Sequence, residues 1–357
     1  MKTAQVQGNN IVIKETTDIK LNGHKGAIVK VLGCGLCGSD IVKFKHNLVN
    51  DGAVLGHEIV AIIDEINSDT DFKTGDKIVS SHHIPCFECT YCKHGNYSMC
   101  SHFKETNIFP GGFSEKVYLS EEHLKNVAYK VPSNLSNEEI SFYEPLGCCI
   151  RAIKRCNLQA QDKILVVGLG SIGLIMAQAI KAFGYEVFGC DLLENRILLA
   201  KEKGIEAFNS LDLDSFNKII QEKTENFGVD AVFMTSGADK AIDVALKTIK
   251  NGGKILVFSS TPQNFGYANN EIYYKELTVM GSYSPSPKDL NDSFNLLTNG
   301  KVNTKNLSTV YTLQNIAQAF EDTINNKVYK AYIQINKWVC EHHSTNSNNK
   351  LQFKKSF

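Results

Sequence analysis

The spacing of hydrophobic and polar positions changes along the chain and predicts two kinds of structure. Between about residues 25 and 130, short β-like runs alternate with turn sequences such as TGD and PGG. Short runs bounded by turn-forming residues predict an irregular β-rich domain. The runs are Ala27–Val31, Glu58–Ile66 and Lys77–Ser80.

From Lys163 to about Ser260, short apolar strands alternate with helix-like segments. This alternation predicts right-handed βαβ crossovers and a doubly wound parallel sheet, so the fold class is α/β. The predicted strands are Ile164–Val167, Glu186–Phe188, Ala231–Phe233 and Lys254–Phe258, and the predicted helices are Ile172–Ala182, Arg196–Lys203 and Ala241–Lys250.

The C-terminal part of the chain is predicted to return to the first domain. Two helical patterns, Leu290–Leu297 and Leu313–Ile324, precede a strand-like Ala331–Ile335. We therefore expect a first domain at 1–150 that also includes 286–337, and a second domain at 151–285. The polar stretch 338–357 is expected to be mobile.

Composition excludes several classes of protein. The 357 residues carry 38 Lys plus Arg and 38 Asp plus Glu, so the net charge is zero and favours neither nucleic acid nor an anionic membrane. The longest uncharged run, Ile164–Ile180, contains three glycines and falls short of the about 20 apolar residues of a membrane span. The N-terminus has no apolar export signal, so a cytoplasmic location is expected.

Four cysteines form the pattern C-x-x-C-x-x-C-x7-C, at Cys86, Cys89, Cys92 and Cys100. In a reducing compartment, clustered cysteines more often bind metal than form disulfides. Two-residue gaps let a turn aim successive thiolates at one point, and four thiolates leave no open position. The pattern therefore predicts a structural zinc site. Neighbouring histidines at 82, 83, 94 and 102 are expected outside this ligand set.

Three further segments carry candidate ligands for a catalytic metal. GCGLCGSD contains Cys37, GHE contains His57 and Glu58, and FYEPLG contains Glu144. A thiolate, an imidazole and a carboxylate are the donors that leave one zinc position open for water or substrate. Zinc in such a site lowers the pKa of a bound alcohol, and Asp40 is placed to orient a ligand.

A dinucleotide site is predicted at GLGSIG, which lies between a predicted strand and a predicted helix. Gly168, Gly170 and Gly173 allow a tight turn and close approach of the pyrophosphate to the helix N-terminus, where Ile172 also lies. Asp191 follows Gly168 by 23 residues (191 − 168 = 23) and would bind the ribose hydroxyls of NAD. Arg196 could instead serve a 2′-phosphate, so NADP stays an alternative.

The order of GLCGSD, GHE, the four-cysteine lobe, GGF, EPLG, GLGSIG and Asp191 resembles the zinc-dependent medium-chain dehydrogenases over roughly residues 1–336. The branch with sorbitol (polyol), galactitol and threonine dehydrogenases is the most similar. The resemblance implies a GroES-like catalytic domain, a Rossmann domain, and a homodimer or homotetramer joined near Leu277–Ser282.

The resemblance also assigns roles to residues. It implies that Cys37, His57 and Glu144 bind the catalytic zinc, with Glu144 acting directly or through water. Glu58 would be an exchangeable ligand or lie just behind the ligands, and Ser39 would pass the substrate proton outward.

Three positions depart from the family pattern. Val42 stands where many relatives have a relay histidine, so the proton would leave through the nicotinamide ribose and water, or through His46. Lys43 replaces a frequent aromatic substrate contact and is either a solvated lysine or a reader of an anionic, phosphorylated substrate. Arg151 replaces a frequent histidine and is expected to face solvent or cofactor.

These observations predict a zinc-dependent oxidoreductase that transfers hydride between a secondary alcohol, a polyol or sugar derivative, and NAD. Threonine dehydrogenase and polyol-phosphate dehydrogenase are alternatives within the same chemistry. A non-catalytic sensor that binds zinc and nucleotide is the alternative from another class.

Overall fold

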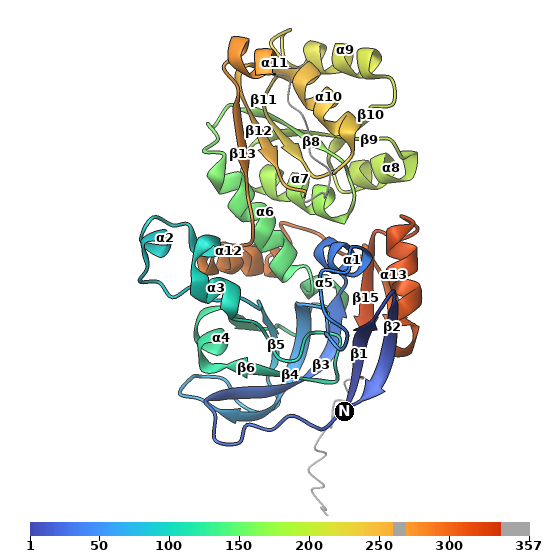
Figure 1. Cartoon of the computed structure of the whole chain (residues 1–357). Coiled ribbons are helices and arrows are strands. Elements are labelled where there is room, and N and C mark those ends of the chain that lie inside the picture. The colour runs from blue at the N-terminus through green and yellow to red at the C-terminus, as the bar shows by residue number, and fades with distance from the viewer. Residues whose placement is uncertain (260–268, 337–357) are drawn as a thin grey trace, which may run out of the picture.

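The computed structural model describes residues 1–259 and 269–336 and shows an α/β unit standing on a β-rich unit (Figure 1). The helix α6 (Tyr143–Arg155) runs between the two units. The polar stretch 338–357, for which mobility is expected, lies outside the described residues.

The β-rich unit is built on a sheet of order β14-β15-β3-β4-β5-β7, with β6 paired to β3. Its strands are β3 (Gly26–Gly35), β4 (Glu58–Asn67), β5 (Lys77–Ser80), β6 (Lys116–Ser120), β7 (Ala128–Lys130), β14 (Ser308–Thr312) and β15 (Lys330–Gln334). The strand runs predicted in this region are all present, and β3 extends four residues beyond Val31. A separate ribbon of β1 (Lys2–Gln7) and β2 (Asn10–Glu15) was not predicted.

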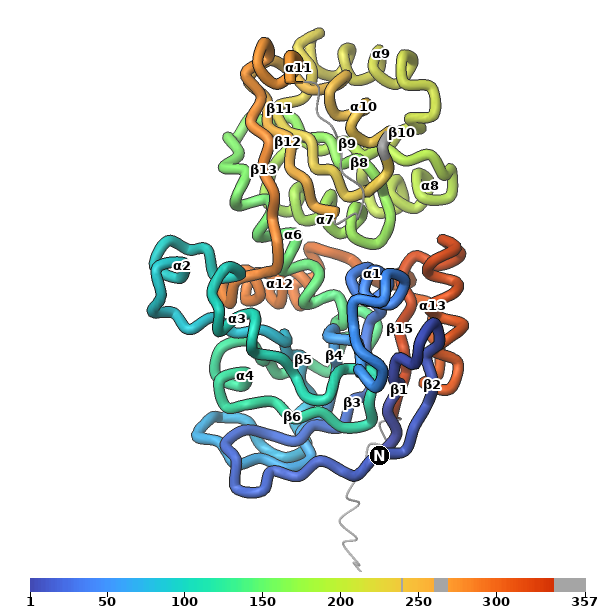
Figure 2. The backbone as a smooth tube through the Cα atoms, viewed as in Figure 1, coloured from blue at the N-terminus to red at the C-terminus, as the bar shows by residue number. Residues whose placement is uncertain are grey.

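The end of the chain returns to this sheet. Strand β15 pairs antiparallel with β3, with Ile333 opposite Cys34. Figure 2 shows β15 and α13 (Ile316–Ile324) lying beside the N-terminal ribbon, and α13 packs on β2. Residues far apart in sequence therefore share one core.

The α/β unit has a six-stranded sheet of order β10-β9-β8-β11-β12-β13, and every neighbouring pair is parallel. Its strands are β8 (Lys163–Val167), β9 (Glu186–Asp191), β10 (Glu206–Asn209), β11 (Val229–Met234), β12 (Ile249–Val257) and β13 (Thr278–Gly281). This is the strand order of a Rossmann sheet, and it confirms the predicted doubly wound class.

The remaining helices pack against the sheets or lie within the segments that connect the strands. They are α1 (Gly38–Lys45), α2 (Thr90–Lys93), α3 (Ser101–Glu105), α4 (Glu121–Asn126), α5 (Asn137–Ile140), α7 (Ser171–Ala182), α8 (Glu194–Glu202), α9 (Leu213–Lys223), α10 (Asp239–Thr248), α11 (Asn269–Tyr274) and α12 (Pro287–Thr298), with 3₁₀ turns η1 (Tyr97–Met99) and η2 (Leu313–Asn315). Among the described residues, no helix has both the length and the apolar content needed to cross a membrane.

One apolar core holds the two units together. It runs from Val60 in the β-rich sheet through Ile150 of α6 to Val166 and Leu174 in the α/β unit. Because α6 is buried on most of its surface, it fixes how the first domain meets the nucleotide-binding sheet.

Candidate active site

Two neighbouring strands bring the candidate catalytic ligands together. Cys37 follows β3 and caps α1, while His57 and Glu58 lie at the start of β4. Since β3 and β4 pair antiparallel with Gly35 opposite Glu58, segments some twenty residues apart meet at one end of the sheet. A ligand atom from each of Cys37, His57 and Glu58 lies within 4.8 Å of the others.

Asp40 holds two of these ligands in place from behind. Its side chain is buried and accepts hydrogen bonds from the backbone N–H groups of Cys37 (3.1 Å) and Gly56 (3.3 Å). Its Oδ1 also lies 3.5 Å from His57 Nδ1. Burial raises the pKa of Asp40, but the charge and hydrogen bond of His57, the Cys37 N–H and the charge of Lys43 together outweigh it and hold the pKa below its ordinary value. Asp40 is thus a carboxylate that orients the imidazole.

Glu58 forms a buried ion pair with Lys330 at the start of β15. Glu58 is 1% exposed and Lys330 is 4% exposed. A Cβ atom at position 35 would lie 2.0 Å from Glu58 Oε2, so the carboxylate fits only because that residue is glycine. Sequence reasoning missed Lys330, whose one visible sign is a lysine at the start of an otherwise apolar strand.

The donor set fits a zinc ion. Glu58 Oε1 is buried and has no hydrogen-bond partner in the described part of the chain. A buried carboxylate oxygen without a donor is costly unless a cation or proton meets it. Sulfur, imidazole nitrogen and carboxylate oxygen are the donors that zinc takes in open sites.

Glu144 and Ser39 border this cluster. Glu144 is buried in the first turn of α6, where burial raises the pKa of its carboxyl and Cys148 Sγ donates to Oε1 at 3.4 Å. It lies outside the group of three donors within 4.8 Å, so its ligation stays a prediction. Ser39 is exposed at the start of α1, with its backbone N–H directed at Cys37 Sγ (3.5 Å).

The four lobe cysteines converge on one point, as the sequence predicts. The recorded Sγ–Sγ distances are 3.5 Å between Cys100 and Cys86, 3.6 Å between Cys89 and Cys92, and 3.9 Å between Cys86 and Cys92. A tetrahedron of sulfurs around zinc with bonds of about 2.3 Å has edges of about 3.8 Å. These thiols are not joined as disulfides, and their spacing fits a structural zinc ion.

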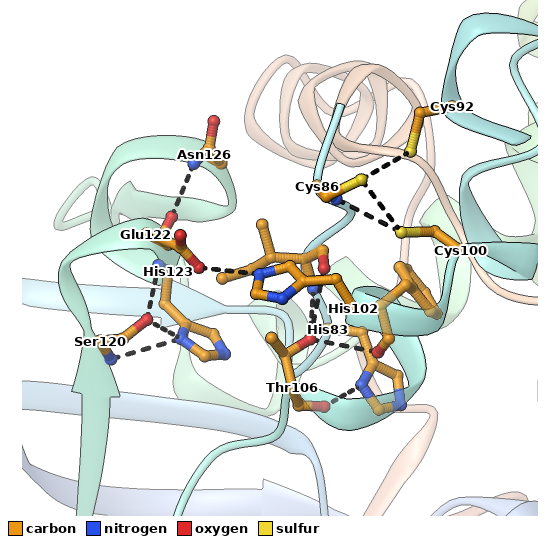
Figure 3. A network of polar contacts seen from close by, with 12 residues as sticks. His83, Cys86, Cys92, Cys100, His102, Thr106, Ser120, Glu122, His123 and Asn126 are labelled. Carbon is orange, nitrogen blue, oxygen red and sulfur yellow. Dashed lines mark hydrogen bonds and ion pairs between the residues drawn. The ribbon is translucent and has the colours of Figure 1, made fainter. Parts of the chain in front are cut away.

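A row of aromatic rings joins the catalytic cluster to this lobe. The His82 ring centroid lies 4.5 Å from that of His57 and 3.9 Å from that of His83, which in turn lies 4.7 Å from Phe103. His83 Nδ1 is hydrogen-bonded to the Thr106 carbonyl (Figure 3). Burial lowers the pKa of His83 to about 4, so the ring is neutral. The sequence did not place His82 against a catalytic ligand.

The predicted dinucleotide loop has the required backbone geometry. Gly168 has φ of +93°, and a Cβ atom at Gly173 would lie 1.8 Å from the Gly168 carbonyl oxygen. At Gly170 the nearest atom to such a Cβ is Arg196 Nη1 at 3.9 Å, which leaves room for close approach of a ligand. Ile172 lies in the first turn of α7 and is partly exposed.

Asp191 lies at the end of β9 beside this loop. Its oxygens accept backbone hydrogen bonds from Leu169 (2.7 Å) and Leu193 (3.0 Å). Arg196 Nη1 lies 3.4 Å from Asp191 Oδ2, and its Nη2 donates to Asn326 Oδ1 at 3.3 Å. The guanidinium is therefore held by partners within the chain.

The positions that depart from the family pattern lie on α1 and α6. Val42, Lys43 and His46 belong to α1 or its C-terminal cap, and Lys43 and His46 are exposed. The Lys43 ammonium is close enough to interact electrostatically with Asp40. Arg151 on α6 is buried, and its Nη2 donates to the Gly95 carbonyl at 3.0 Å. The expectation that this arginine faces solvent is therefore wrong.

Comparison with known proteins defines the class. Residues 23–132 match the alcohol dehydrogenase GroES-like domain, and residues 171–299 match the zinc-binding dehydrogenase domain. The chain is 30% identical over 336 residues to D-arabitol-phosphate dehydrogenase from Enterococcus avium, covering 92% of this chain and 93% of the relative. It is 32% identical to sorbitol dehydrogenase from Halalkalibacterium halodurans, covering 82% and 86%.

Among solved structures, an oxidoreductase/dehydrogenase of unknown specificity from Escherichia coli is similar with a TM-score of 0.83. It is 26% identical, and the match covers 94% of this chain and 99% of that one. The chain therefore belongs to the zinc-dependent medium-chain dehydrogenases. This confirms the predicted fold, the zinc dependence and the oxidoreductase class.

Proposed function

We propose that the protein transfers hydride between a secondary alcohol of a polyol or sugar derivative and NAD. The observation that carries the proposal is the convergence of Cys37, His57 and Glu58, together with the unpartnered Oε1 of Glu58. The names of the relatives, a D-arabitol-phosphate dehydrogenase and a sorbitol dehydrogenase, support the substrate class.

The residues divide into those that hold metal and those that handle the substrate. Cys37 and His57 hold the catalytic zinc with Glu58 or Glu144 as the carboxylate, and the four lobe cysteines hold the structural zinc. Bound zinc supplies a Lewis acid that lowers the pKa of the substrate hydroxyl. Ser39 takes the hydroxyl proton, which, without a histidine at position 42, leaves through the nicotinamide ribose and water or through the exposed His46.

The glycine loop after β8 and Asp191 at the end of β9 together support a preference for NAD. Gly168, Gly170 and Gly173 let the pyrophosphate approach the N-terminus of α7, next to Ile172. The Asp191 carboxylate binds ribose hydroxyls and repels a 2′-phosphate, and Arg196 is engaged with Asp191 and Asn326. This arrangement favours NAD over NADP.

The assembly proposed is a homodimer or homotetramer. Strand β13 is the outer strand of its sheet, and Val279 in it is 36% exposed. An exposed edge strand of this kind invites pairing with a second copy. The catalytic domain comprises 1–150 with 286–337, and the nucleotide domain comprises 151–285. A cytoplasmic location is proposed because the ligand thiols must stay reduced.

The test is a screen of zinc-loaded protein for NADH formation, with and without a chelator. Sorbitol, galactitol, ribitol, their phosphates, threonine and simple secondary alcohols are each offered with NAD and with NADP. A polyol substrate with NAD, lost on chelation and in Cys37→Ser, supports the proposal. Cys156→Ser removes a buried thiol that lies outside both cysteine-containing donor clusters and contacts Met280, and is the matched control. Turnover of threonine alone, or tight NADH binding without turnover of any compound, would contradict the proposal.

A further inference from the structure

A cavity of about 450 Å³ lies beside α6, outside the donor cluster described above. Its walls come from η1 in the four-cysteine lobe, from α6, and from the residues at the ends of β12 and β13. Its charged lining residues within the described chain are Arg151 and Arg155. The cavity is therefore positively charged, although the whole protein has a net charge of zero.

Both arginines are held in place but keep free donors. Arg151 Nη2 donates to the Gly95 carbonyl, and Nη1 lies 3.8 Å from Asp289 Oδ2. Arg155 donates from Nε to the Gly281 carbonyl (3.1 Å) and from Nη1 to Asn96 Oδ1 (3.4 Å). A guanidinium carries five N–H donors, so these contacts leave several for a ligand.

The one acidic partner of Arg151 is shared with other groups. Asp289 Oδ1 accepts from Lys154 Nζ at 2.7 Å, and its Oδ2 accepts from the hydroxyl of Ser286 at 2.5 Å. Lys154 also pairs with Asp292 Oδ2 at 2.6 Å, so it compensates the charge of Asp289 only in part. Arg155 has no carboxylate partner among the described residues, so its charge acts on the cavity most directly.

A second observation points to a ligand with acceptor oxygens. Ser282 lines the same cavity, and its Oγ is buried without a hydrogen-bond partner in the described part of the chain. Buried hydroxyls ordinarily have a partner. Guanidinium groups together with a free hydroxyl donor are the chemistry that recognises a phosphate group.

Helix α6 joins this cavity to the catalytic cluster. Glu144, Cys148, Arg151 and Arg155 follow one another at spacings of four, three and four residues, which places them on one face of α6. Cys148 contacts Glu144 at one end of this stripe, and the two arginines line the cavity at the other. Arg151 lies seven residues after Glu144 (151 − 144 = 7), or about 10 Å along the axis.

We propose that the cavity binds the phosphate group of a polyol phosphate whose distant hydroxyl reacts at the catalytic cluster. This inference rests on the proposed function and narrows its substrate class. The substrate would span the separation of about 10 Å along α6 between Glu144 and Arg151, with the reacting carbon at one end and the phosphate at the other. Lys43, the other candidate anion reader, is a single exposed ammonium on α1.

The kinetic test compares each polyol with its phosphate ester, using galactitol with galactitol 1-phosphate and D-arabitol with its phosphate. The ester should have a kcat/KM at least tenfold higher in the wild type. Arg155→Gln should lower this preference about tenfold or more, because charge-assisted hydrogen bonds are lost. Because Arg155 is exposed, replacing it should disturb folding less than replacing the buried Arg151. Arg151→Gln serves as the second test.

Two control variants separate this role from others. Lys254→Gln removes a positive charge from β12, at a residue that does not line the cavity and whose Nζ donates to the Asn157 carbonyl at 2.8 Å, and should leave the ester preference unchanged. Lys43→Gln tests the rival anion reader. The inference is wrong if the ester preference depends on Lys43, or if Arg155→Gln raises the KM for NAD instead of the KM for the ester.

A binding measurement works without turnover. Inorganic phosphate should inhibit ester oxidation competitively and raise the melting temperature of the wild type, and both effects should weaken in Arg155→Gln. Metal-dependent oxidation of polyols without ester preference or phosphate binding would overturn the inference but leave the proposed function standing. Absence of oxidation of every polyol and ester would overturn the proposed function itself.

Discussion

Replacing Lys330 by methionine keeps most of the side-chain volume but removes the countercharge of Glu58. Both side chains are almost fully buried, at 4% and 0% exposure. Glu58 Oε1 already lacks a hydrogen-bond partner in the described part of the chain. Lys330→Met therefore leaves a buried carboxylate that neither water nor a neighbouring cation stabilises.

The expected cost comes from the desolvation of that carboxylate. Breaking a buried pair by removing one partner costs about 3–5 kcal/mol, much more than the net stabilisation by an intact pair. We expect this loss in zinc-free protein. In zinc-loaded protein the loss should be smaller, because a metal ion bound by Glu58 supplies a positive charge in place of Lys330. Equal losses in both forms would show that Glu58 does not bind the metal.

The assay is urea unfolding of zinc-free and zinc-loaded protein, with the unfolding free energy taken from the midpoint and slope. Lys130→Met is the matched control. It removes an ion pair of 2.8 Å with Asp76, but Lys130 is 46% exposed, so the loss should be at or below about 1 kcal/mol. A Lys330→Met loss in zinc-free protein no larger than that of Lys130→Met would refute the reasoning.

Three further outcomes are expected. Gly173→Ala should raise the KM for NAD at least tenfold and weaken NADH binding in a fluorescence titration, because its Cβ would lie 1.8 Å from the Gly168 carbonyl oxygen; an unchanged KM would show that the loop relaxes freely. Cys92→Ser should lower the zinc content by one ion per chain, measured by atomic emission, and lower the melting temperature; unchanged content would exclude Cys92 as a ligand. Burial lowers the pKa of His83 from 6.5 in the unfolded chain to about 4 in the folded chain. Between pH 6.5 and pH 4 the unfolded chain therefore binds a proton that the folded chain does not, and the free energy of unfolding falls as the pH falls. The wild type should lose about 3 kcal/mol more than His83→Gln between pH 7 and pH 4 in urea unfolding, and parallel pH profiles would contradict this.

Local patterns predicted those parts of the site that local geometry creates. The lobe cysteines lie within fifteen residues, so the turn that links them brings their sulfurs together whatever surrounds it. The GLGSIG loop is similar, because Gly168 and Gly173 meet within one strand–turn–helix segment. The convergence of Cys37 with His57 needed a strand pairing, which the resemblance to the dehydrogenases supplied.

Contacts between distant segments were outside the reach of sequence patterns. Lys330 reaches Glu58 because β15 returns to pair with β3, and nothing near either residue indicates that register. The contact of His82 with His57 depends on how the loop after β5 packs against β4. Arg151 was expected to face solvent or cofactor, and the packing of α6 against the lobe buries it instead.

The sequence by itself determined the α/β class, the four-cysteine site and the dinucleotide loop, because each depends on short segments of defined conformation, while the catalytic ligands were named through the resemblance to the dehydrogenases. Only the tertiary structure decided the buried Glu58–Lys330 pair and the cavity with two arginines beside α6. Those features join segments up to 272 residues apart (330 − 58 = 272). Their geometry is set by which surfaces pack together, and that depends on the whole core rather than on any local pattern.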